Sequence, residues 1–240
     1  RWKNLLWIKE EDQTYLGPFV AGKTGQRPLI ARDRAIRPLE RQLQLNPNLK
    51  GKTLDEVKAI RRGEAENAAK ALGVHDIKFL DMGDYPLRFT EEAENQVVDI
   101  IRDVQPNFMM SHSKWDPYNT DHMKTTDFAL TCRMIAQAWG HNPGQKVLGA
   151  PQMYLFEPHQ TEQMHWKPDV FLDITPVWEK KRKAMECNEG QIHLWDFYTR
   201  VAQQRANHFK RNSGGMAGGR DCKYAEGFES IFPRTVDELS

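Results

Sequence analysis

The chain has 240 residues, of which 39% are hydrophobic and 28% are charged, and this is enough for one large domain with a buried core. Its 34 Lys and Arg residues balance 33 Asp and Glu residues, so the composition indicates no nucleic-acid partner and no membrane-surface partner. No apolar run approaches the roughly 20 residues that a membrane-spanning helix needs, and the first residues lack the apolar core of a signal peptide.

Residues 1–45 differ from the rest of the chain. They are interrupted by Gly and Pro, with Gly17-Pro18 as one example, and they show no clean strand or helix period. They also contain no histidine, since the first in the chain is His75. The sequence therefore predicts an atypical N-terminal segment over 1–45 and a folded domain over 46–240.

Two helices and two strands are predicted between residues 53 and 110. Thr53 and Glu56 fit a capping box that begins a helix, and Gly73 fits the position just after its end. A short strand over 77–80 follows, and Thr90 then begins a second helix with an apolar face. Residues 107–110 read as another strand.

The second half of the chain continues the alternation. A polar loop over 111–122 leads into a helix that runs to about residue 139. Strands are predicted over 152–156 and 170–174, and helices near 176–187 and 191–211. Because strands alternate with helices, the expected fold is α/β, a single domain with a Rossmann-like, mostly parallel sheet flanked by helices.

The three cysteines of the chain indicate a cellular location. They are far apart and form no CxxC pair, so neither a disulfide framework nor a cysteine zinc site is indicated. Reduced thiols in a cytoplasmic protein are the expectation. The three are Cys132, Cys187 and Cys222.

The loop over 111–122 carries the first group of candidate functional residues. Ligands of α/β sheets bind at the carboxyl ends of strands, and this loop follows such an end. It holds two imidazoles and two carboxylates, which suit zinc or a similar divalent ion: His112, Asp116, Asp121 and His122. On local sequence alone, the pattern is better explained by a helix cap at Asp121 with His122 in the first turn.

The loop over 156–160 carries the second group. His159 directly follows an apolar strand, where active-site groups collect, and an imidazole there suits general acid or base chemistry. A solvated loop histidine is the alternative that the local sequence leaves open.

Residues 46–240 contain a set of motifs in a fixed order: Arg61-x-x-Glu64, Ala68-Ala69-x-x-Leu72-Gly73, Ser111-His112 and Asp121-His122. With these motifs the segment resembles the LmbE-like superfamily, whose members include the N-acetylglucosaminyl-phosphatidylinositol de-N-acetylases. The resemblance implies a zinc-dependent enzyme in which His122 is a metal ligand.

Three longer motifs are Gly83-Asp84-Tyr85-Pro86-Leu87-Arg88, Asp116-Pro117-Tyr118-Asn119-x-Asp121-His122 and Phe156-Glu157-Pro158-His159-Gln160. They are similar to motifs of the 4-oxalomesaconate hydratase family within that superfamily. This resemblance implies that water is added to an unsaturated tricarboxylate in bacterial gallate and protocatechuate breakdown, with His159 facing the substrate. Asn119 replaces the acid histidine of the deacetylases, which favours hydration over amide hydrolysis.

The expected roles of the remaining residues follow from this resemblance. His112, Asp116, Asn119 and Asp121 are expected to support the metal or the substrate. Arg61, Arg88 and Lys114 are candidates to bind substrate carboxylates, for which an Arg fork is the better partner. The expected partner is therefore a small polycarboxylate, with a homo-oligomer also possible.

The N-terminal segment departs from the superfamily. The resemblance implies a first strand ending in His-x-x-Asp, which supplies two zinc ligands, and residues 1–45 contain no such motif. Three explanations are an altered or misread translation, a truncated product and a divergent protein. Two alternative functions therefore accompany the hydratase: a zinc-dependent de-N-acetylase of an N-acetylated sugar, and an inactive or metal-free relic.

Overall fold

The computed structural model describes residues 29–32, 49–80, 82, 87–213 and 221–234. The helices and strands in chain order are β1 (Leu29–Arg32), α2 (Leu54–Leu72), β2 (Ile77–Leu80), α3 (Glu91–Val104), β3 (Phe108–Ser111), α4 (Thr120–Gln137), β4 (Gln152–Phe156), η1 (Thr161–Gln163), β5 (Val170–Asp173), η2 (Thr175–Val177), α5 (Trp178–Glu186), η3 (Glu189–Gln191), α6 (His193–Asn212) and β6 (Ala225–Ser230).

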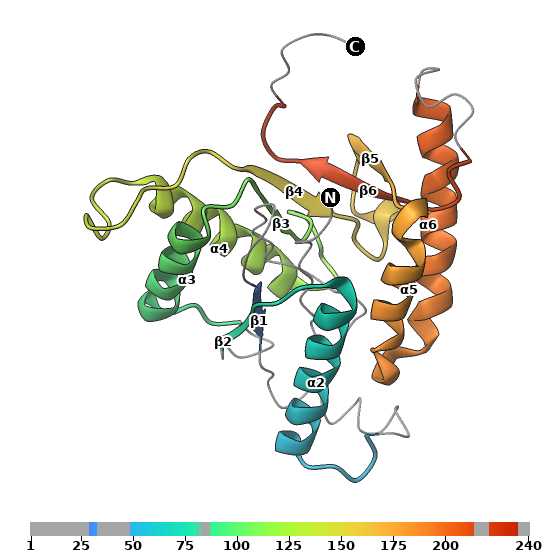
Figure 1. Ribbon diagram of the computed structural model, residues 1–240, viewed down its shortest axis with the longest axis horizontal. Helices are drawn as coiled ribbons and strands as arrows, with labels where there is room; N and C mark the ends of the chain where they lie inside the picture. Colours follow the sequence, from blue (N-terminus) through green and yellow to red (C-terminus); the bar gives the residue numbers. More distant parts are fainter. Residues whose placement is uncertain (1–28, 33–48, 81, 83–86, 214–220, 235–240) are drawn as a thin grey trace.

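The strands of the described residues form two hydrogen-bonded groups. In the first, β1 pairs in parallel with β2. In the second, the order is β3-β4-β6-β5, with β3 parallel to β4 and β6 antiparallel to both of its neighbours. Figure 1 shows α3 and α4 on one side of the strands and α5 and α6 on the other.

The predicted fold class is confirmed: the protein is a single α/β domain with helices flanking the sheet. Among the described strand pairs the sheet is mixed rather than mostly parallel, since two of its pairings are antiparallel. The physical reason is β6, which enters between β4 and β5 in the opposite direction. The sequence patterns predict no strand in this C-terminal segment, and they do not predict β1.

Local signals account for the helix ends that lead toward the site. The Thr53 side chain and Glu56 form the expected capping box of α2, and Gly73 ends that helix with a positive φ of 75°. Thr90 caps α3. Asn119 caps α4 by accepting a hydrogen bond from the backbone N–H of Asp121, which begins that helix beside the polar loop.

The main core lies between the helices and the second group of strands. It gathers the apolar face of α3, the inner side of α4 and the central residues of β3 and β4, with Val98, Ile101, Met109 and Met153 fully buried. Burial of these faces fixes the strands from which both candidate loops emerge. No helix of the described chain has both the length and the apolarity that a membrane span requires.

Candidate functional site

The two candidate loops emerge side by side from the sheet. Because β3 and β4 are parallel and Ser111 pairs with Leu155, their carboxyl ends lie at the same edge. His112 and Phe156 are therefore neighbours, and their rings meet edge to face with centroids 4.7 Å apart. This is the edge at which the sequence predicts that the polar residues collect.

Asp116 organises the polar loop from within. Its Oδ1 accepts hydrogen bonds from the backbone N–H groups of Tyr118 and Asn119, at 3.1 and 3.0 Å. Its Oδ2 lies 2.6 Å from Nδ1 of His122. One buried carboxylate thus holds the turn and the first turn of α4 together.

Both ring nitrogens of His122 have defined partners. The Oδ1 of Asn119 caps α4, so the Nδ2 of the same amide is the group that lies 2.8 Å from Nε2 of His122. Since an amide nitrogen only donates, Nε2 accepts, and Nδ1 donates its proton to Asp116. The network therefore assigns a neutral His122 with its proton on Nδ1.

The ring of His112 packs against the ring of His122. The two rings stack with centroids 4.0 Å apart and an interplanar angle of 6°. The hydroxyl of Thr126 lies 2.9 Å from the Ser111 hydroxyl and donates to the backbone carbonyl of His112. The end of β3 is thereby bound to α4, and His112 is held between His122 and Phe156.

Although Asp121 precedes His122 in the sequence, its carboxylate binds Leu87 and Lys124. Its fully buried carboxylate accepts a hydrogen bond from the backbone N–H of Leu87 at 3.0 Å and forms an ion pair with Lys124 at 3.1 Å. It therefore fixes the backbone next to Arg88, which is itself exposed. The ring of His122 is held by Asp116.

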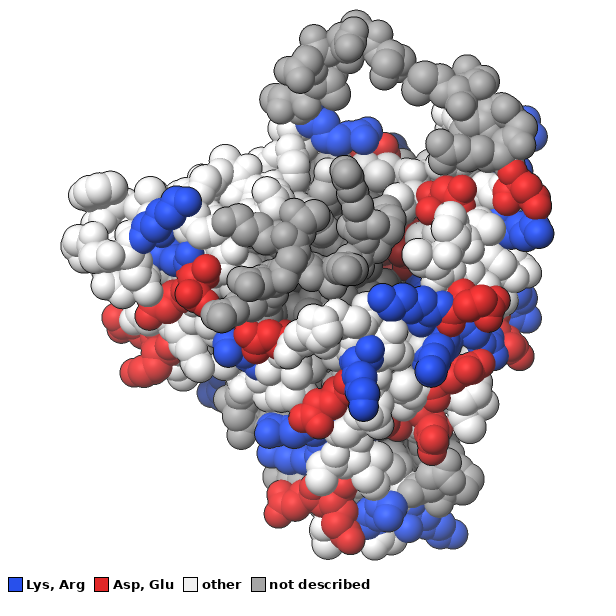
Figure 2. Space-filling model, viewed as in Figure 1, with Lys and Arg blue, Asp and Glu red and all other residues white. Residues whose placement is uncertain are grey.

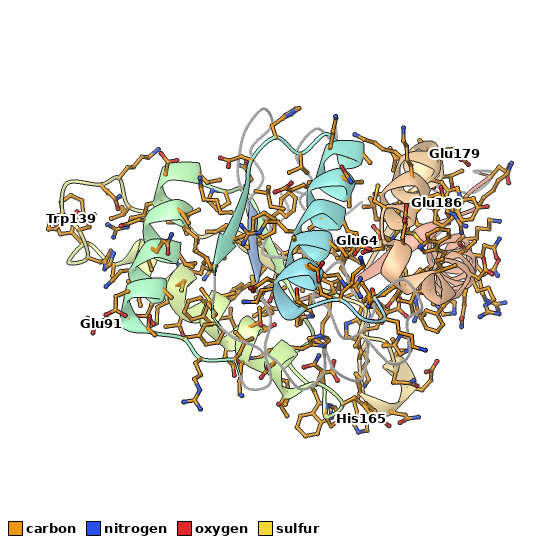
Figure 3. The ribbon with its side chains drawn as sticks, turned by 90° about the horizontal axis from the view of Figure 1, so that it is seen from below. Glu64, Glu91, Trp139, His165, Glu179 and Glu186 are labelled. Atoms are coloured by element: carbon orange, nitrogen blue, oxygen red, sulfur yellow. The ribbon has the colours of Figure 1, made fainter. Side chains whose placement is uncertain are left out.

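Arg61 belongs to α2, and its buried side chain packs against Gly190 of η3. Its Nη1 donates to Oε2 of Glu64 at 2.9 Å, and Oε1 of Glu64 accepts from the backbone N–H of Gly190 at 3.0 Å. Figure 3 shows Glu64 on the side of α2 that faces α5 and α6. The Arg61-x-x-Glu64 motif thus joins these helices in the structure, and a contact with substrate stays a prediction.

His159 lies against α6. Its ring centroid is 4.5 Å from that of Phe197 and 6.5 Å from that of Tyr198. Two residues earlier, Glu157 receives a two-pronged ion pair from Arg205 of the same helix, with Nε 2.7 Å from Oε2 and Nη2 on Oε1. The sequence motif includes Glu157 and His159, but it does not predict that Arg205 is the partner of Glu157.

A cavity opens behind the end of β4. Phe156 and Glu157 form one side, α5 and α6 another, and β6 closes it, with Tyr198, Lys181 and Glu226 among the lining residues. Lys181 is ion-paired with Glu226, and Glu157 with Arg205, so each carboxylate on the wall has a cationic partner. Phe156 lines this cavity, and its ring also packs against His112.

The face of the molecule visible in Figure 2 carries both signs of charge. Figure 2 shows Lys and Arg interspersed with Asp and Glu on the visible face. Lys114, Trp115 and Tyr118 of the polar loop are exposed, and the Tyr118 hydroxyl donates to the side chain of Gln163 in η1. No sequence signal indicates this link between the two loops, because the residues are 45 positions apart.

The donor groups at this edge fit only part of a metal centre. The Asp116–His122 pair matches the arrangement in which a carboxylate orients a ligating imidazole. Nevertheless, no group of three His, Cys, Asp or Glu residues suited to a metal occurs within the described ranges. A catalytic zinc site commonly uses three protein ligands, so these residues alone do not build one.

Comparison with known proteins identifies the family. A family model described as GlcNAc-PI de-N-acetylase (PIG-L) matches residues 29–132. A 4-oxalmesaconate hydratase of Pseudomonas putida is 50% identical over 185 residues, covering 77% of this chain and 71% of that protein. The chain therefore belongs to the PIG-L, or LmbE-like, superfamily, as its motifs predicted.

Within the superfamily the chain groups with hydratases. The crystal structure of GalB, the 4-carboxy-2-hydroxymuconate hydratase of Pseudomonas putida KT2440, matches with a TM-score of 0.80 and 45% identity, covering 88% of this chain and 87% of that one. A diacetylchitobiose deacetylase of Thermococcus kodakarensis is more distant, at 29% identity over 182 residues, covering 72% of this chain and 63% of that protein.

Proposed function

We propose that this protein is a hydro-lyase that adds water to the carbon–carbon double bond of 4-oxalomesaconate, an unsaturated tricarboxylate of bacterial gallate and protocatechuate breakdown. The observation that carries the proposal is the 50% identity to the hydratase of Pseudomonas putida over 185 residues. The His122–Asn119 hydrogen bond supports it, because an amide at position 119 supplies no acid for releasing an amine.

His159 is proposed to move the proton. Hydration forms one C–O bond and one C–H bond, breaks the π bond of the alkene and transfers one proton from water to carbon. An imidazole suits this role because it can accept and return a proton near neutral pH. His159 follows β4 at the edge where His112 and His122 also lie, and its ring is only partly buried.

Cationic side chains around the polar loop are proposed to bind the substrate carboxylates. Arg88 and Lys114 are both exposed at this edge, and the Leu87 backbone beside Arg88 is fixed by Asp121. Arg61 is a weaker candidate, since its guanidinium is buried against Glu64 and Gly190. A fork such as that of Arg88 binds a carboxylate through two parallel hydrogen bonds.

Zinc is proposed as the cofactor on the strength of the family and of the Asp116–His122 pair. When bound, such an ion polarises a carbonyl or activates water. His122 would offer Nε2, with its ring oriented by Asp116, and the Asn119 amide that donates to Nε2 would have to give way to the ion. Elemental analysis of the purified protein tests this proposal, and a folded, active sample without stoichiometric metal would contradict it.

Turnover of the substrate tests the hydratase. Loss of the conjugated chromophore should follow addition of protein, and His159→Asn should reduce kcat by about 100-fold or more. His165→Asn is the matched control, since His165 is exposed, and it should retain normal turnover. Folded protein that leaves the chromophore unchanged would refute the proposed reaction.

The two alternatives have distinct signatures. Release of acetate from an N-acetylated sugar would identify a de-N-acetylase, whereas a well-folded protein without metal and without either activity would identify a relic. A small polycarboxylate is the proposed ligand. A homo-oligomer is also proposed, and light scattering tests it. A cytoplasmic location is likewise a proposal.

A further inference from the structure

The segment that carries His159 is stiff, and it contacts α6 at two places along that helix. Proline fixes its own φ and restricts the residue before it to extended conformations, so Glu157-Pro158-His159 transmits the position of one end to the other. Pro158 is buried. Along α6, Phe197 and Tyr198 contact the His159 ring, and Arg205 binds the Glu157 carboxylate about two helical turns further on.

The Arg205–Glu157 contact is itself well held. The two side chains are only 10% and 14% exposed, and the guanidinium contributes both Nε and Nη2 to the carboxylate. Nη1 lies 2.9 Å from Nδ1 of His208, and the guanidinium carbon lies 5.6 Å from the ring centroid of Trp166. A planar fork fixed on several sides defines the direction of its partner, which a lysine cannot do.

We propose that Arg205 is a positioning residue for the reaction, acting through Glu157 to set the place and orientation of the His159 ring. This inference rests on the proposed role of His159 in proton transfer. Arg205 acts at a distance: its guanidinium binds Glu157, and the Pro158 link carries that constraint to the histidine. A displacement of about 1 Å at a proton-transferring group can cost about 100-fold in rate, so a modest loosening is measurable.

The kinetic test uses Arg205→Lys, which keeps the charge and removes the fork. We expect kcat to fall by about 10-fold or more with KM within about twofold of the wild type, because the substrate-binding groups are unchanged. In a His159→Asn background the same substitution should cause no further loss, since it acts through that ring. Wild-type kcat in Arg205→Lys, or equal losses in both backgrounds, would overturn the proposal.

The matched control is Arg182→Lys on α5. Arg182 also pairs with a carboxylate, with Nε 2.7 Å from Oε1 of Glu186, and its guanidinium carbon lies 5.7 Å from the ring centroid of Trp195. Its Nη1 also donates to the Thr199 hydroxyl of α6 at 2.9 Å. These contacts tie Arg182 to α5 and to the first two turns of α6, and they do not involve Glu157 or His159, so its substitution should leave kcat unchanged. An equal fall of kcat in this control would show a general effect of loosening α5 and α6 and would also overturn the proposal.

A second readout does not depend on turnover. Nitrogen-15 NMR of histidine-labelled protein reports the ring of His159, assigned by its loss in His159→Asn. Arg205→Lys and Glu157→Gln should both shift this resonance and its titration, whereas Arg182→Lys should not. If the resonance moves but the wild type has no hydratase activity, the positioning stands and the proposed function fails; an unmoved resonance refutes the positioning itself.

Discussion

The amide of Asn119 donates to Nε2 of His122 across 2.8 Å while its carbonyl oxygen caps α4. One side chain therefore begins the helix and sets the protonation pattern of its histidine. These two tasks can be separated by substitution.

Asn119→Asp should separate them. Aspartate caps a helix as well as asparagine does, so the free energy of unfolding should change by less than about 1 kcal/mol. A carboxylate, however, presents only acceptors to Nε2 and favours a proton there, so turnover should fall at least about 10-fold. Thermal unfolding and initial rates measure both. Thr90→Ala, which removes the cap of α3, is the control that should lower stability by about 1 kcal/mol and spare activity.

Asp116→Asn should weaken metal binding. The amide oxygen can still accept from the backbone, but the carboxylate that orients His122 is lost, and such partners are worth about 10- to 100-fold in metal affinity. Competition with a chromogenic chelator measures zinc affinity directly. Asp127→Asn, on the exposed side of α4, should bind zinc as the wild type does. Equal affinity in both variants would argue against the orienting role of Asp116.

Substitution by alanine should raise the free energy of unfolding at one glycine and lower it at another. Gly63 lies within α2 with open space where an added methyl group would point, so Gly63→Ala should stabilise the protein by about 0.5–1 kcal/mol. A Cβ on Gly190 would lie against the guanidinium of Arg61, which Glu64 holds in place, so Gly190→Ala should cost about 1–3 kcal/mol. Urea unfolding gives both values. If Gly190→Ala left the free energy of unfolding unchanged, the Arg61 side chain would have to move aside freely.

The cysteines should differ in reactivity. Cys132 is fully buried, and burial together with the nearby Glu94 raises the pKa of its thiol far above the ordinary value. Burial also raises the pKa of Cys187, but this residue is partly accessible. Since the thiolate is the reactive form, iodoacetamide should modify Cys187 first, as seen by mass spectrometry. Denaturant should abolish the difference, and fast native labelling of Cys132 would contradict its burial.

Glu229 should make stability fall with rising pH. Burial, followed by the charge of Asp169, raises the pKa of this carboxyl, while Lys114 opposes the shift. The folded state therefore keeps this proton to a higher pH than the unfolded state, so folding loses stability as pH rises from about 4 through the folded pKa. Glu229→Gln should flatten this decline in Tm. Glu179→Gln, an exposed change on α5, should leave it as in the wild type.

Local signals explain why part of the fold was predictable. The capping box at Thr53 and Glu56 and the apolar face of α3 are short-range patterns, and both helices formed as expected. β6 was missed because Ala225–Ser230 lacks a clear alternating pattern and forms a strand through pairing with β4 and β5. The direction of such a pairing depends on the whole sheet and cannot be read locally.

The same distinction applies to the site. Functional loops of α/β sheets gather at the carboxyl ends of parallel strands, which predicts that the loops of His122 and His159 share one edge. The parallel pairing of β3 with β4 places them there. The rule cannot say which carboxylate meets which ring, since that depends on how the loop turns. Arg205 and Glu157 are 48 residues apart, so no spacing in the sequence indicated their ion pair.

The position of β6 bears on how the protein is made. β4 and β5 are synthesised more than 50 residues before the strand that joins them, so a growing chain presents two unpaired strand edges until residues 225–230 emerge. Such edges are templates for pairing between chains. Mutations that weaken β6 should therefore first reduce the yield of folded protein in the cell, before they reduce the activity of the molecules that do fold.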